Sequence, residues 1–202
     1  MQNVEFKAEL RDLSIARAVC RSLKAPLVAT LEQTDTYYRT FNGRLKKRET
    51  VHADPGIPAD ERTPEPVEFI HYDRDNRTRP KISAFRIMTE DEFRERFGSE
   101  PLAEWLTVRK SRAVYLLDHT RIHLDTVEGL GRGGQPGGFI EFESMVSKNN
   151  NVAKAHETIE SLRAAFGPVL GEPISVGYSD LLDAQINNQN DRRIDETSPL
   201  SD

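Results

Sequence analysis

The chain has 202 residues and a mass of 22.9 kDa; 30% of the residues are charged, 37% are hydrophobic, and the formal net charge is −5. This size predicts a single domain, and the absence of any run of about eighteen apolar residues argues against a membrane-spanning helix. The negative charge argues against general nucleic-acid binding, which favours a basic domain. Cys20 is the only cysteine, which excludes an intrachain disulfide and a cysteine-rich metal site.

The first residues of the sequence show no basic segment followed by an apolar stretch. We therefore expect no signal peptide, a cytoplasmic location, and neither a membrane nor a nucleic acid as partner. The composition does not determine the oligomeric state, and a homodimer is possible.

The first half of the chain predicts a strand, a helix and a β-hairpin. Residues 3–7 alternate as in a strand, and apolar residues at three- and four-residue steps then predict a helix capped by Asp12, with Pro26 beyond its end. Two strands at residues 34–39 and 44–50 flank Asn-Gly, the strongest short hairpin signal. Residues 52–67 are rich in proline and acidic residues and predict an exposed loop insertion.

The second half predicts more strands and three helices. Thr89 and Glu92 form a capping-box pattern for a helix that ends at Phe97, and residues 101–106 and 150–166 predict two further helices. The predicted strands cover residues 68–74, 81–87, 107–111, 113–118, 120–127 and 138–146. Residues 186–202 are polar and aperiodic, so we predict a domain over residues 1–185 followed by a disordered tail.

Charges of opposite sign alternate along two of these strands. Arg44, Lys46 and Arg48 share one face of a strand, and Glu141 and Glu143 share one face of another. A solvated strand face is the ordinary explanation of one such pattern. Solvated faces usually mix the two signs, however, so several strands sorted by sign favour a binding site with a basic wall and an acidic wall.

Carboxylates on alternating positions also indicate a metal site. Glu141 and Glu143, with Asp125 and Glu5, supply the oxygen ligands that Mg²⁺ or Mn²⁺ prefers, and these ions commonly share their ligands with substrate phosphates. His123 has the same strand parity as Asp125, but no second histidine or cysteine is suitably spaced, so we assign it an orienting role at most.

A glycine-rich stretch at residues 129–134 resembles a phosphate-binding loop only superficially. Such a loop lies between a strand and a helix, whereas a strand is predicted to follow here. We therefore interpret the stretch as a hairpin connection.

Taken together and in this order, the motifs resemble the CYTH family, also called triphosphate tunnel metalloenzymes. The resemblance extends over residues 2–182 and rests on the segments 3–7, 35–38, 43–48, 110–112, 121–125, 129–131 and 139–143. The Gly-Leu-Gly turn at 129–131 and the segment 178–182 are more similar to the class IV adenylyl cyclase branch than to the thiamine triphosphatase branch. Asn3 stands where the family pattern has a glutamate, which removes one carboxylate and leaves the number of metal ions open.

This resemblance implies an α+β fold: an eight-stranded antiparallel β-barrel, the triphosphate tunnel, flanked by helices. It implies that Glu5, Asp125, Glu141 and Glu143 hold Mg²⁺ or Mn²⁺. It also implies that a set of cations neutralises a small-molecule triphosphate; within this set Lys7, Lys110 and Arg112 are the catalytic candidates, and the substrate-binding candidates are Arg44, Lys46, Arg48, Arg74 and Arg121.

The activity implied by the resemblance is that of a class IV adenylyl cyclase, which converts ATP to cyclic AMP and pyrophosphate. A hydrolase of tripolyphosphate, thiamine triphosphate or a nucleotide needs the same triphosphate clamp and remains the alternative. A non-catalytic triphosphate sensor is the third hypothesis, and Asn3 makes it conceivable.

Overall fold

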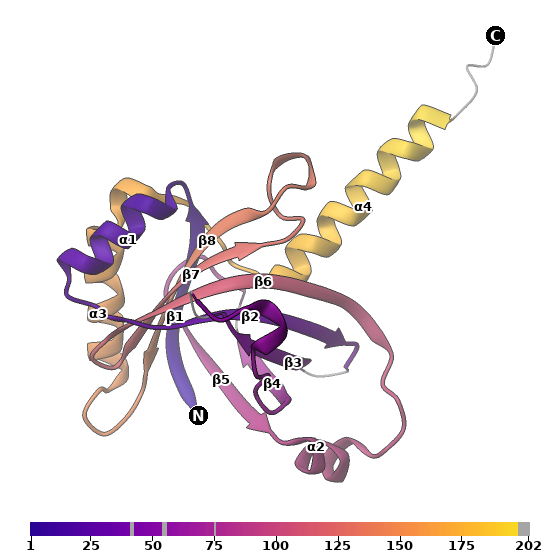
Figure 1. The fold of residues 1–202 in the computed structure, drawn as a ribbon, viewed down its shortest axis with the longest axis horizontal. Coiled ribbons are helices and arrows are strands. Elements are labelled where there is room, and N and C mark those ends of the chain that lie inside the picture. The colour runs from indigo at the N-terminus through magenta and orange to yellow at the C-terminus, as the bar shows by residue number, and fades with distance from the viewer. Residues whose placement is uncertain (41–42, 54–55, 75, 198–202) are drawn as a thin grey trace.

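The computed structural model describes residues 1–40, 43–53, 56–74 and 76–197, without the side chains of residues 74 and 189–197. Its eight long strands form a closed antiparallel β-barrel, as predicted (Figure 1). Neighbouring strands follow the order β5-β4-β3-β2-β6-β7-β8-β1, and pairing of β5 with β1 closes the barrel. A short ninth strand pairs with β1 outside this ring.

The strands are β1 (Gln2–Leu10), β2 (Leu27–Tyr38), β3 (Arg44–His52), β4 (Glu68–Arg74), β5 (Lys81–Met88), β6 (Glu104–Leu117), β7 (Thr120–Val127), β8 (Gly137–Met145) and β9 (Leu170–Pro173). The α-helices are α1 (Leu13–Ser22), α2 (Glu90–Phe97), α3 (Val152–Ala165) and α4 (Tyr178–Thr197). Three single 3₁₀ turns lie at Ala59–Glu61, Arg132–Gly134 and Gly167–Val169.

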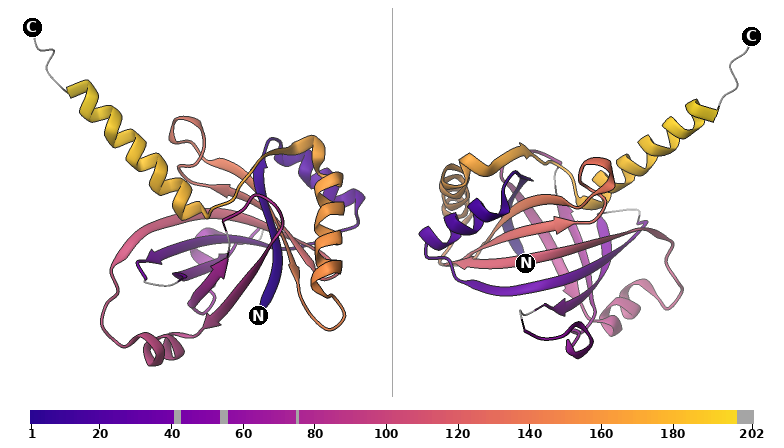
Figure 2. Two further views of the ribbon diagram at one scale, coloured as in Figure 1. Left: turned by 180° about the vertical axis from the view of Figure 1, so that it is seen from behind. Right: turned by 45° about the horizontal axis from the view of Figure 1, so that its top comes forward.

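The outward faces of β1, β7 and β8 form the main hydrophobic core together with helices α1 and α3. Val4 and Phe6 of β1 and Phe142 of β8 are buried, and the ring centroids of Phe6 and Phe142 are 5.9 Å apart. Phe142 also packs on Phe166, at the end of α3, with 5.3 Å between centroids. Helices α1 and α3 lie together on this side of the barrel (Figure 2). Because successive side chains of a strand point to opposite faces, the polar residues that alternate with these apolar ones must point into the barrel.

A second apolar cluster occupies one end of the barrel interior. It contains Tyr37, Val108, Val127 and Phe139, and it is completed by Tyr178 from the first turn of α4. From this anchored first turn, α4 projects away from the barrel (Figure 1). No described helix is long and apolar enough to cross a membrane.

Local sequence signals located several element boundaries well. The side chain of Asp12 accepts a hydrogen bond from the Ile15 amide at 2.9 Å, which caps α1 as predicted. Thr89 and Glu92 form the predicted capping box of α2. The glycine-rich stretch connects β7 to β8, as expected of a hairpin connection. Phe41 and Asn42 of the predicted first hairpin lie outside the described residues, whereas Gly43 has the positive φ of +68° that such a turn requires.

Several sequence predictions differ from the structure. The strands predicted separately at 107–111 and 113–118 form one strand, β6, because Arg112 continues the pairing with both β2 and β7. The helix predicted at 101–106 is wrong, because β6 already begins at Glu104, where cross-strand pairing of Leu106 with Tyr37 overrides the weak helical pattern. The tail predicted to be disordered is helical up to Thr197, since no glycine or proline interrupts α4 after its anchored first turn. Residues 198–202 lie outside the described chain, and the domain boundary at residue 185 stays a prediction.

Phe142→Ala tests the core between the barrel and α3. Phe142 is fully buried, so its truncation should lower the free energy of unfolding by about 3–5 kcal/mol. Leu116→Ala is the matched strand control, because Leu116 is 40% exposed, and it should change stability by less than about 1 kcal/mol. Urea unfolding followed by circular dichroism measures both. Equal losses in the two variants would contradict the assigned core.

Candidate active site

A cavity of about 300 Å³ lies inside the barrel and is lined by strand residues of inward parity. It collects most of the residues that the sequence marked as site residues: Glu5, Lys7, Lys46, Arg48, Lys110, Arg112, Arg121, Glu141 and Glu143. Arg44 and Asp125 are not among its lining residues, and the Arg74 side chain lies outside the described part of the structure.

One wall of the cavity is a cluster of three cations on a single carboxylate, Asp35 of β2. Lys46 and Lys110 donate to Asp35 Oδ2 at 2.8 and 2.6 Å. Arg48 donates to both carboxylate oxygens, at 2.7 and 2.9 Å. Three positive side chains against one negative one leave a surplus of positive charge, which suits an anionic ligand.

Burial and mutual repulsion perturb the pKa values in this wall. Burial opposes ionisation of Asp35, but Arg48, Lys110 and Lys46 hold its pKa well below the usual value. Burial lowers the pKa of Lys110 to about 8, against the opposing effect of Asp35 and with a further contribution from Arg48. Burial, and then Arg48, also lowers the pKa of Lys46. An anion in the cavity would favour the charged form of both lysines.

Asp125 lies behind the cavity wall, where it positions Arg112. Its oxygens accept hydrogen bonds from Arg112 at 2.7 and 2.6 Å, and Oδ2 also accepts one from the Tyr178 hydroxyl at 2.7 Å. Asp125 is fully buried. The carboxylate of this predicted metal ligand is therefore hydrogen-bonded to an arginine and a tyrosine. Arg44 points toward α4 instead, with an ion pair to Asp180 at 2.6 Å.

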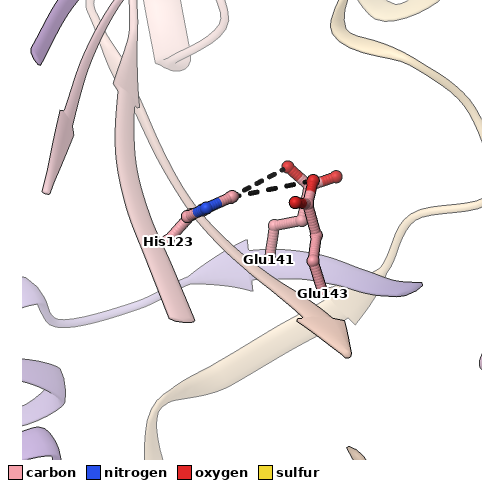
Figure 3. A group of neighbouring side chains, drawn as sticks. All are labelled: His123, Glu141 and Glu143. Atoms are coloured by element: carbon pink, nitrogen blue, oxygen red, sulfur yellow. Dashed lines mark ion pairs between the residues drawn. The ribbon is translucent and has the colours of Figure 1, made fainter. Parts of the chain in front are cut away.

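A second wall is acidic and belongs to strands β7 and β8, of which β7 pairs with β6 of the basic wall. His123, Glu141 and Glu143 bring their ligand atoms within 4.8 Å of one another (Figure 3). Glu141 pairs with Lys7 at 3.2 Å and accepts from Arg112 at 2.9 Å. Burial opposes its ionisation, but Lys7, His123 and Arg112 hold the pKa of Glu141 well below the usual value. A carboxylate that is already ionised is ready to bind a cation.

Strand β1 continues this wall. Glu5 is the cross-strand neighbour of Glu143, and Lys7 is the neighbour of Glu141. Asn3 lines the cavity as well, and its Oδ1 atom is buried without a hydrogen-bond partner among the described residues. Carboxylate, amide and imidazole donors together fit a divalent cation.

The third part of the lining is apolar and comes from β4 and β5. Ile70 and Tyr72 contribute from β4, and Phe85 and Ile87 from β5. These side chains offer a surface for an uncharged, ring-containing group beside the charged walls.

Sequence reasoning missed the central role of Asp35 and undervalued two other residues. Asp35 has inward parity on β2, so strand alternation was a usable signal. The parity of His123 was noted, but its convergence with Glu141 depends on the β7–β8 register. Tyr178 comes from a helix start, and no strand pattern could have indicated it.

A closed antiparallel barrel that encloses an acidic and a basic wall defines a triphosphate tunnel fold. The chain belongs to the CYTH family: the CYTH domain model matches residues 59–168. Proteins of this family are generally divalent-metal-dependent enzymes that process triphosphates.

Solved structures of the same fold share little sequence with this chain. The PH1819 protein of Pyrococcus horikoshii OT3 has a TM-score of 0.62 at 21% identity, covering 91% of this chain and 99% of that one. A candidate adenylate cyclase of Vibrio parahaemolyticus has a TM-score of 0.59 at 15% identity, with coverages of 90% and 97%. A candidate adenylyl cyclase of Hippeastrum, described as having a dominant triphosphatase activity, has a TM-score of 0.56 at 12% identity, with coverages of 90% and 95%. No curated protein matches significantly in sequence.

Asp35→Asn tests the charge balance of the basic wall. The change keeps the shape of the side chain but removes the counter-charge of Lys46, Arg48 and Lys110, so it should lower the free energy of unfolding by about 3–5 kcal/mol. Added sulfate should recover part of this loss by occupying the wall. Glu49→Gln, which removes an exposed partner of Lys47, is the control and should cost less than about 1 kcal/mol. Urea unfolding with and without sulfate measures these changes. A loss of unfolding free energy as small as that of the control would contradict the role of Asp35 as the counter-charge of the basic wall.

Proposed function

We propose that this protein is a divalent-metal-dependent enzyme that converts ATP to cyclic AMP and pyrophosphate inside the barrel cavity. The observation that carries the proposal is the sorting of charge within one cavity: cations gather around Asp35, and Glu141 and Glu143 converge with His123 on strands β7 and β8. A polyphosphate with a bound cation is complementary to both walls.

In this proposal the phosphate chain lies along the basic wall. Lys46, Arg48 and Lys110 neutralise its charge, while Lys7 and Arg112 lie between the phosphates and the acidic wall. Arg121, at the exposed edge of the lining, adds a further cation, and Arg74 keeps its predicted substrate-binding role. Arg44, held by Asp180, is assigned to positioning α4.

Glu5, Glu141 and Glu143 would hold Mg²⁺ or Mn²⁺, and Asp125 would act through Arg112. The bound cation would supply charge neutralisation for the phosphates. The protein contributes fixed donors around the reacting phosphate, and such preorganised electrostatics is the main catalytic factor in phosphoryl transfer.

The apolar lining supports a substrate with an organic group. Tyr72 and Phe85 offer rings on which an adenine can pack, and an inorganic triphosphate would leave this surface unused. In the cyclase reaction the ribose 3′-hydroxyl attacks the α-phosphorus and pyrophosphate leaves, so the base must hold the ribose at the inner end of the phosphate chain.

A triphosphate hydrolase is the second candidate, because the cations of the basic wall suit the phosphate groups of any triphosphate, nucleotide or not. The Hippeastrum protein, with its described triphosphatase activity, gives this candidate additional support. In that case water attacks the terminal phosphorus of tripolyphosphate, thiamine triphosphate or a nucleotide.

Product identification separates the two reactions. With Mg²⁺ or Mn²⁺, ATP should yield cyclic AMP and pyrophosphate, and 3′-deoxy-ATP should bind without reacting because it lacks the nucleophile. Chromatography with mass detection measures the products.

The controls are the double variant Glu141→Gln/Glu143→Gln, which should lose metal-dependent turnover while keeping its fold, and the surface variant Glu160→Gln, which should keep it. Phosphate release from ATP or tripolyphosphate without cyclic AMP would replace the cyclase with the hydrolase. Tight binding of tripolyphosphate without any turnover would indicate a sensor.

Lys110 should take up a proton when a triphosphate binds. Its pKa of about 8 leaves it largely neutral at pH 8.5, and a bound polyanion should raise that pKa. Affinity for tripolyphosphate should therefore fall as the pH rises above about 8. Metal-free calorimetry at pH 8.5, in two buffers of different ionisation enthalpy, measures the uptake.

Lys110→Met is the comparison for this proton uptake. The wild-type protein should take up a larger fraction of a proton than the variant, since the ligand and the remaining groups are common to both titrations. Equal proton uptake by the two proteins would contradict the assignment to Lys110.

A further inference from the structure

We propose that His123 binds the divalent cation directly through Nδ1, so that the cation site is a mixed nitrogen and oxygen site. His123, Glu141 and Glu143 form its convergent group, and Glu5 lies beside them as the cross-strand neighbour of Glu143. This inference deepens the proposed function, because it concerns the metal of that same cavity. It assigns to the site a ligand type, imidazole, that none of its carboxylates provides.

The position of His123 follows from strand register. His123 of β7 is the cross-strand neighbour of Glu141 of β8, and both side chains have inward parity. Glu143 lies two residues further along β8 and therefore on the same face. The three side chains converge in Figure 3 because two rigid, paired strands hold them.

The distances fit ligands placed around an ion better than a hydrogen bond. His123 Nδ1 lies 3.6 Å from Glu141 Oε2 and 3.9 Å from Glu143 Oε1, beyond ordinary hydrogen-bond length. Two atoms that each lie about 2.1 Å from one cation are about 3.0–3.4 Å apart at ordinary coordination angles. Shifts of up to about half an ångström would thus bring this nitrogen to the separation expected from either oxygen. The ligand atoms of all three residues lie within 4.8 Å of one another.

The nitrogen itself is not satisfied by a hydrogen bond among the described residues. Nδ1 of His123 is also buried. A buried polar atom left in this state is costly unless a ligand completes it. Glu141 Oε2 already accepts a hydrogen bond from Arg112, but a carboxylate oxygen has a second lone pair that an ion can use.

A nitrogen ligand changes which cation the site prefers. Magnesium favours oxygen ligands, whereas imidazole suits transition metals such as Co²⁺ and Zn²⁺. The mixed set should therefore bind Co²⁺, Mn²⁺ or Zn²⁺ more tightly than Mg²⁺. The adjacent Lys7 and Arg112 repel any cation, so metal alone should bind only moderately.

Pulsed electron paramagnetic resonance tests the nitrogen ligand without substrate or turnover. Metal-free protein is loaded with Mn²⁺ alone, and electron spin echo modulation is recorded. Nitrogen modulation should appear in the wild type and in His119→Gln, in which an exposed histidine next to β7 is replaced. It should vanish in His123→Gln. Modulation that is absent from the wild type, or unchanged in His123→Gln, would overturn the proposal.

Labelling keeps the test decisive if His123→Gln does not fold. Wild-type protein grown with ¹⁵N-histidine should show the modulation of ¹⁵N in place of ¹⁴N, because His123 is the only histidine within a cluster of potential metal ligands in the described residues. Modulation that does not respond to histidine labelling would assign the nitrogen to another group and overturn the proposal. Failure to bind Mn²⁺ at millimolar concentration would do the same.

Calorimetry with metals alone tests the preference. His123→Gln should weaken Co²⁺ binding by at least about tenfold and change Mg²⁺ binding little. Equal weakening for both ions would indicate a purely positional role for His123 and count against direct ligation. Because neither readout involves a triphosphate, a negative cyclase or hydrolase assay would leave this inference standing, and the reverse also holds.

Discussion

Charge balance inside the barrel is the constraint on which the rest of the structure depends. A closed eight-stranded barrel can fill its interior with apolar side chains, but this chain directs charged ones inward and must compensate their desolvation. Asp35 compensates Lys46, Arg48 and Lys110, and Asp125 compensates Arg112. In neither group do the carboxylates outnumber the cations. The surplus of positive charge around Asp35 leaves this part of the cavity electrostatically suited to an anion.

Strand register places the two walls in contact along shared cross-strand rows. Glu141 has Lys7 on one side and His123 on the other, so the candidate cation site and Lys7, a proposed phosphate-binding group, are neighbours in the backbone ladder. Side chains on paired strands have little freedom to rearrange, which keeps the reorganisation required on binding small. If the proposed sites are correct, ligand and metal binding should be interdependent, because a polyphosphate would screen the repulsion between Lys7 or Arg112 and a cation.

Strand alternation was sufficient to predict which residues face the barrel interior. The period of two fixed the inward parity of Glu5, Lys46, Arg48 and Glu143, and the structure places all four on the cavity wall. What parity cannot give is the partner of each side chain, since that depends on strand order and register. Parity therefore could not show that Asp125 accepts two hydrogen bonds from Arg112, or that three cations converge on Asp35. The ion pair of Arg44 with Asp180 was likewise not predictable from strand alternation, because Asp180 belongs to a helix.

Tyr178 shows how the chain beyond the barrel becomes part of the cavity. Its hydroxyl donates to Asp125, its ring packs on Phe139 with centroids 5.0 Å apart, and Lys7 Nζ lies 4.0 Å from the ring centroid. Burial, and then Asp125 and Glu141, raises the pKa of Tyr178 well above its usual value, so the hydroxyl stays protonated and remains a donor. One side chain therefore orients Asp125, and through it Arg112, while it also contacts the lysine that pairs with Glu141. The first turn of α4 is for this reason an element of the site. Tyr178, together with the Arg44–Asp180 ion pair, couples the anchoring of that helix to the arrangement of the cations.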